Sequence, residues 1–103
     1  MDLVEEYWEY VPNFPEYVVS NYGHIRRTGQ RSGRPLSRRI EDGAVVVYLN
    51  IGESEPRRFR LDRIVAAAFL GAMRHDMMQI DIEHIDNDPF NCKANNLRLV
   101  RRD

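Results

Sequence analysis

Residues 83–97 decide the interpretation of this chain, and they read Glu-His-Ile-Asp-Asn-Asp-Pro-Phe-Asn-Cys-Lys-Ala-Asn-Asn-Leu. His84 ends an apolar, alternating segment, and a loop rich in Asp and Asn follows it. Asn96 lies twelve residues beyond His84, directly before the apolar segment Leu97–Val100. Two such segments joined by a turn-forming loop predict a β-hairpin, in which Asn96 returns beside His84. An amide oxygen there can hold one imidazole N–H, which leaves the other ring nitrogen to accept a proton from water.

Glu83, next to the histidine, adds a carboxylate that can bind a hard divalent cation such as Mg²⁺ or Mn²⁺. A base and a metal ion together suffice to hydrolyse a phosphodiester. The simpler alternatives are a histidine bonded only within its hairpin and a glutamate that is merely solvated.

The remaining segments predict a small α+β domain. Short strands are expected at 17–20, 24–26, 36–39, 44–51 and 57–61, and hairpin strands at 79–85 and 97–100. Apolar residues from Leu61 to Phe69 follow helical spacing, Asp62 suits the start of that helix, and Gly71 can end it. With 103 residues the chain is expected to form a single domain (1–103). It has no apolar run long enough for a membrane span, and its single cysteine excludes an internal disulfide, so we expect a cytoplasmic protein.

Charge is strongly segregated along the chain although the net charge is −1. Residues 24–39 hold six arginines and no acid, which favours a polyanionic partner such as double-stranded DNA. The predicted DNA-binding residues are Arg26, Arg27, Arg31, Arg34, Arg38 and Arg39. Residues 1–20 and 74–91 each hold five acids, which would instead suit a protein partner with a basic groove.

Four segments together resemble the HNH endonucleases of the homing and phage type. Residues 84–100 resemble the ββα-metal core, residues 7–26 the short motif that precedes the core, residues 45–49 the strand before it, and residues 63–70 the helix that packs on it. The resemblance implies an N-terminal motif with its Arg-rich loop at 1–40 and an HNH-like core at 44–103. It also implies that His84 is the general base, that Asn96 orients it, that Glu83 binds the metal, and that the arginines contact DNA phosphates.

The chain departs from the family pattern in the helix that follows the second strand and supplies a further metal ligand. The chain ends seven residues after Asn96, so we expect the hairpin without that last helix. DNA cleavage, DNA binding without cleavage, and binding to or inhibition of another protein all remain open from the sequence. The oligomeric state is open as well.

Overall fold

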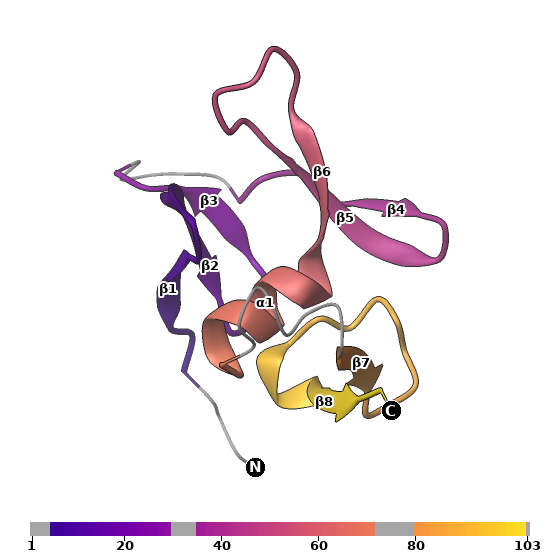
Figure 1. Cartoon of the computed structure of the whole chain (residues 1–103). Helices are drawn as coiled ribbons and strands as arrows, with labels where there is room; N and C mark the ends of the chain where they lie inside the picture. The colour runs from indigo at the N-terminus through magenta and orange to yellow at the C-terminus, as the bar shows by residue number, and fades with distance from the viewer. Residues whose placement is uncertain (1–4, 30–34, 72–79, 103) are drawn as a thin grey trace.

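The computed structural model describes residues 5–29, 35–71 and 80–102. Within them, three antiparallel sheets surround one α-helix (Figure 1). This arrangement confirms the predicted α+β class with one main helix. Arg31 and Arg34, two of the predicted DNA-binding residues, lie outside the described residues.

The first sheet is formed by the N-terminal segment, with strands β1 (Trp8–Val11), β2 (Phe14–Ser20) and β3 (Ile25–Arg27) in that order. Tyr17 and Val19 of β2 are buried, as expected for alternate residues that face the core. Asn13 adopts a φ of 71° in the tight connection between β1 and β2. Asparagine tolerates this left-handed conformation better than most residues, so it suits the turn.

The second sheet contains strands β4 (Arg39–Glu41), β5 (Ala44–Leu49) and β6 (Arg57–Arg60). Strand β4 begins at Arg39, where the predicted strand 36–39 ended. In β5, Val45, Val47 and Leu49 face the core, while Val46 and Tyr48 face the other side of the sheet. The register pairs Val46 with both Arg39 and Arg60, and it pairs Tyr48 with Arg58. All three arginines therefore lie on the face of this sheet that points away from the core cluster, called the outer face below; Val46 at its centre is buried.

Helix α1 (Leu61–Phe69) begins directly after β6 and lies between the sheets (Figure 1). Its buried residues Leu61, Ile64 and Val65 join a single apolar cluster to which both three-stranded sheets contribute. The helix stops before Gly71, whose φ of 71° favours glycine and agrees with the predicted end. None of the helices in the described part of the chain is long and apolar enough to cross a membrane.

The C-terminal hairpin consists of β7 (Ile80–His84), a short 3₁₀ turn η2 (Ala94–Asn96) and β8 (Leu97–Arg101). His84 pairs with Leu97 at the end of the ladder next to the loop. Ile82 and Leu97 pack toward the core cluster, and α1 contacts both strands and η2. This contact brings the start of the helix close to His84.

Candidate functional site: a buried histidine and exposed arginines

His84 is almost enclosed and both of its ring nitrogens have partners. Its Nδ1 lies 3.0 Å from the backbone oxygen of Asn91, and its Nε2 lies 3.1 Å from Oδ2 of Asp62. The side chains of His84 and Asp62 are only 9% and 3% exposed. A backbone carbonyl only accepts hydrogen bonds, so Nδ1 donates to the Asn91 oxygen while Nε2 faces the carboxyl group of Asp62. In this arrangement Nε2 already has a partner, so the position from which it would contact a water molecule is taken by Asp62.

Asp62 is the residue of this site that the sequence interpretation missed. It lies in the first turn of α1, where the sequence indicated a favourable charge at the helix start and a departure from the histidine common in the resembled family, but no contact with His84. Its carboxylate instead accepts two bonds from the guanidinium of Arg60, at 2.7 and 3.2 Å, as well as the bond from His84. Arg60 is 44% exposed, so the row Arg60–Asp62–His84 runs from the surface into the interior.

The amide oxygen of Asn96 does not accept a hydrogen bond from the imidazole, so the predicted direct hydrogen bond is wrong. Its Oδ1 accepts from the backbone N–H of Asp86 at 3.0 Å, and its amide donates to Asp86 Oδ1 at 2.9 Å and to the Asn91 oxygen at 3.0 Å. The loop folds back so that this backbone oxygen lies between the two side chains and accepts from both. Asn96 thus ties the hairpin loop together and positions the carbonyl that holds His84.

The same loop stabilises the ionised form of Asp86. Its carboxylate accepts from the amide of Asn91, from the backbone N–H of Asp88 and from the amide of Asn96. These bonds, with that from Asn91 the most important, hold the pKa of Asp86 below its usual value. Asp86 therefore orders the turn, which is the role expected for an aspartate at such a position.

Glu83 points to the other side of strand β7 from His84. Consecutive residues of a strand face opposite sides, and the burial pattern of β7 alternates in this way, with Glu83 exposed and His84 largely enclosed. The Glu83 carboxylate pairs with Arg98 of β8. The structure therefore does not bring the two predicted site residues together.

The described residues do not fit a divalent metal ion. They contain no group of three or more His, Cys, Asp and Glu side chains that could hold one. The carboxylate of Asp62 is already engaged by Arg60 and His84, and that of Glu83 by Arg98.

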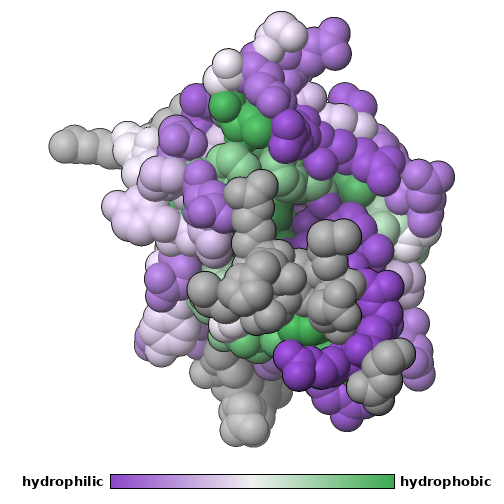
Figure 2. All heavy atoms as spheres, in the orientation of Figure 1, coloured by the Kyte–Doolittle hydropathy of each residue, from purple (hydrophilic) through white to green (hydrophobic). Residues whose placement is uncertain are grey.

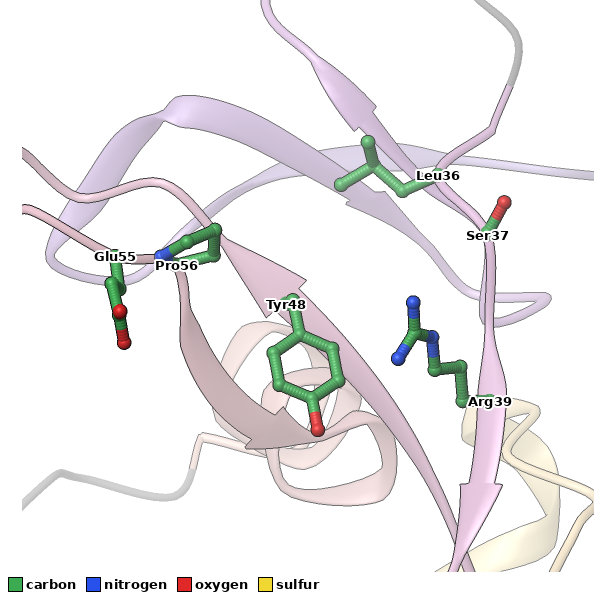
Figure 3. A pocket seen from close by; sticks show the side chains of 6 residues that line it. All are labelled: Leu36, Ser37, Arg39, Tyr48, Glu55 and Pro56. Carbon is green, nitrogen blue, oxygen red and sulfur yellow. The ribbon is translucent and has the colours of Figure 1, made fainter.

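Four of the six predicted arginines lie among the described residues, in or next to the two three-stranded sheets. Arg26 and Arg27 lie on β3, with their guanidinium carbons 4.2 Å from the Trp8 ring and 5.4 Å from the Tyr17 ring. Arg38 is exposed, and Arg39 lies on β4 with its guanidinium carbon 5.3 Å from the ring of Tyr48. Figure 3 shows Arg39 and Tyr48 side by side at an open hollow that Leu36, Ser37, Glu55 and Pro56 also line.

Two further arginines, Arg58 and Arg60, share the outer sheet face with Arg39. Arg58 contacts Glu41 at 3.3 Å and Asp42 at 3.4 Å, and the hydroxyl of Tyr48 donates to Glu41. The alternation in residues 57–60 indicates that Arg58 and Arg60 share one face of a strand. Only the pairing of this strand with β5 shows that Arg39 lies on the same face. Figure 2 shows hydrophilic side chains gathered over this sheet.

Cys92 is buried beside the site and is not a nucleophile. Its side chain belongs to the apolar cluster, and the residue is 3% exposed. Burial, and secondarily the negative charge of Asp62, raises the pKa of the Cys92 thiol to about 12. A thiol with such a pKa stays protonated and unreactive at neutral pH.

Comparisons with known proteins agree with the resemblance seen in the sequence. Residues 6–50 match the NUMOD4 motif. A solved structure described as DNA binding and cleavage by the HNH homing endonuclease I-HmuI matches with a TM-score of 0.74 and 26% identity. The match covers 92% of this chain and 52% of that chain, so this chain spans about half the length of that protein. No curated protein matches the chain. The resemblance to HNH homing endonucleases is thus confirmed: the chain carries a NUMOD4 motif and shares the fold of an HNH homing endonuclease.

Proposed function

We propose that this protein binds double-stranded DNA through an HNH homing-endonuclease fold. The observation that carries the proposal is the structural similarity, over 92% of the chain, to an endonuclease whose structure is described as one of DNA binding and cleavage. That similarity extends over nearly the whole chain and not only over the NUMOD4 segment. It therefore supports the proposal that the two proteins bind DNA in a similar way.

The exposed arginines supply the chemistry that DNA binding needs. Arg27 and Arg39 each lie over a tyrosine ring, which restrains the side chain while its N–H groups remain able to bind phosphate. Arg38 precedes Arg39 in the chain and is exposed as well. Phosphate contacts of this kind provide affinity that depends strongly on salt and little on sequence.

DNA cleavage with His84 as general base is the second candidate function. It is favoured by the position of His84 at the end of β7, in the segment that resembles the nuclease core. For this chemistry the contact between Nε2 and Asp62 would have to open, since both ring nitrogens are engaged. Mg²⁺ or Mn²⁺ would be needed as well, and Glu83 would have to leave Arg98 to bind it. The geometry therefore supports binding better than cleavage.

The binding proposal is tested by the affinity for a DNA duplex as a function of salt concentration. The double variant Arg34→Ala, Arg38→Ala should weaken binding and lower the slope of log K against log salt by about 1.8, since each lost phosphate contact contributes about 0.9. Arg57→Ala is the matched control, because Arg57 is exposed but paired with Glu53 at 2.8 Å. A slope equal to that of the control would reject the assignment of these arginines.

Cleavage is tested by nicking of supercoiled plasmid in the presence of Mg²⁺ or Mn²⁺. Nicking that disappears in His84→Ala, in a variant that still binds DNA, would establish the second function. DNA binding without nicking would leave the first function alone. Absence of DNA binding even at low salt would reject both and favour a protein partner, for which the acidic segments 1–20 and 74–91 are the candidates.

A further inference from the structure

We propose that the open hollow on the second sheet is a binding site for one guanine nucleotide whose base is unpaired. We call this site the Tyr48 hollow, and it is lined by Leu36, Ser37, Arg39, Tyr48, Glu55 and Pro56 (Figure 3). The inference does not need a DNA duplex and so does not rest on the proposed function, although Arg39 takes part in both.

The ring of Tyr48 offers a fixed aromatic surface on which a base can stack. Figure 3 shows one face of this ring turned to the open side of the hollow. The Tyr48 hydroxyl donates to both oxygens of Glu41, at 2.9 and 2.8 Å, and Glu41 also accepts from Arg58 at 3.3 Å, so the ring is held in place. The hollow has a volume of about 650 Å³. This volume lies within the range of about 300–1,000 Å³ that is usual for small-molecule sites.

Arg39 supplies a cation without an acidic partner on one side of the ring. Its guanidinium carbon lies 5.3 Å from the ring centroid of Tyr48. The other three arginines of this sheet, Arg57, Arg58 and Arg60, each pair with a carboxylate. Among the described residues, no carboxylate pairs with Arg39. Its guanidinium is therefore available to bind the phosphate of a nucleotide through two N–H groups.

Glu55 supplies a free acceptor on the other side of the ring. Figure 3 shows Tyr48 between Arg39 and Glu55. Glu55 is exposed, and no cation in the described part of the chain pairs with it, whereas Glu53 in the same turn pairs with Arg57 at 2.8 Å. The hollow thus presents a cation, an aromatic ring and an anion in that order.

This order of groups matches a guanine nucleotide. Its phosphate would bind to Arg39, its base would stack on Tyr48, and its pairing edge would face Glu55. Guanine carries two adjacent N–H donors on that edge, and a carboxylate can accept from both at once. Adenine, cytosine and thymine lack such a pair of donors. A guanine within a duplex uses this edge for its partner base, so the site requires an unpaired one.

The test is a titration with guanosine monophosphate (GMP), followed by NMR. GMP should shift the signals of the Tyr48 ring and of the Arg39 Nε–H. Arg39→Ala should weaken GMP binding by about tenfold or more, because it removes a charged hydrogen-bond donor. Arg57→Ala is the matched control and should leave the affinity within about twofold, because Arg57 is exposed and already paired. Tyr48→Leu should cost about five- to tenfold, whereas Tyr48→Phe keeps the ring and should retain most of the affinity.

Glu55→Gln separates a guanine contact from a general charge effect. Removal of a negative charge beside the hollow would, by electrostatics alone, raise the affinity for an anionic nucleotide. The proposal predicts the opposite for GMP, a loss of about five- to tenfold, because glutamine cannot accept from both guanine donors. Adenosine monophosphate should bind this variant no more weakly than it binds the wild type. Glu53→Gln is the control, and it should leave the ratio of the two affinities unchanged.

Equal or tighter GMP binding by Glu55→Gln would overturn the proposal, and so would the absence of NMR shifts at millimolar GMP. These variants lie at exposed positions, so they keep the test decisive even if Tyr48→Leu fails to fold.

The nucleotide can be free or part of a DNA strand, and a second comparison distinguishes these sources. It uses GMP, a pentanucleotide with one guanine between thymines, and a pentanucleotide of thymine alone. Tighter binding of the guanine-containing strand than of GMP would assign the Tyr48 hollow to a strand, and equal or weaker binding to a free nucleotide. GMP binding by a protein that binds no duplex would support the hollow and reject the proposed function. Duplex binding without GMP shifts would keep the proposed function and overturn this inference.

Discussion

Replacing Asn96 with alanine should loosen the hairpin that holds His84. The change removes three hydrogen bonds, two with Asp86 and one with the Asn91 oxygen. A hydrogen bond contributes about 0.5–1.5 kcal/mol net, and Asp86 is exposed, so water can replace part of what it loses. We therefore expect the free energy of unfolding to fall by about 2–3 kcal/mol. This is a large fraction of the roughly 5–15 kcal/mol that stabilises a typical domain.

Urea denaturation measures this loss, with Asn95→Ala as the matched control. Asn95 precedes Asn96 in the same 3₁₀ turn but is exposed, and its replacement should change stability by less than about 0.5 kcal/mol. With a typical dependence of about 1–3 kcal/mol per molar urea, the midpoint for Asn96→Ala should drop by about 1 M or more. Faster hydrogen exchange of the Asp86 amide should accompany it. Equal midpoints for the two variants would refute the role assigned to Asn96.

Three further predictions concern the core. Cys92 should resist alkylation at pH 8 in the native protein and react readily in urea, because burial raises its pKa to about 12 in the folded state. The thiol of the unfolded chain has a lower pKa of about 8.5, so the folded protein should lose stability as the pH rises from about 9 to 12. Urea denaturation at a series of pH values would measure this loss. A free energy of unfolding that stays constant over this range would contradict the burial effect. Tyr17→Phe should cost about 1–2 kcal/mol, because the Tyr17 hydroxyl accepts from the Asn50 N–H at 2.8 Å in a buried position. Tyr7→Phe, at a residue that is 57% exposed, is the control in the same thermal-melting assay, and a similar loss in both would contradict the assignment.

Elements with strong local patterns were predictable from the sequence. The β-branched run at 44–51 gave a strand close to the observed Ala44–Leu49, and the helical spacing from Leu61 to Phe69 matched α1. The hairpin around residues 83–97 was predicted as well, because a turn-rich loop between two apolar segments is a local signal.

The contacts within the site were not predictable, because they depend on residues far apart in the chain and on the backbone. Asp62 reaches His84 across 22 residues, and no local pattern indicates that contact. The acceptor at His84 Nδ1 is the backbone carbonyl of Asn91, whose direction depends on the path of the loop rather than on its side chain. Arg39, Arg58 and Arg60 share one face only through the register of three strands.

The central position of α1 has a consequence for how the chain folds. In each of the described sheets, neighbouring strands are also consecutive in the sequence, so every sheet closes only short loops and can form early. The helix then has to dock against strands from both ends of the chain, which involves contacts of large sequence separation. We therefore expect α1 docking to dominate the folding barrier, so that changes at Val65 slow folding, whereas changes in the hairpin mainly speed unfolding.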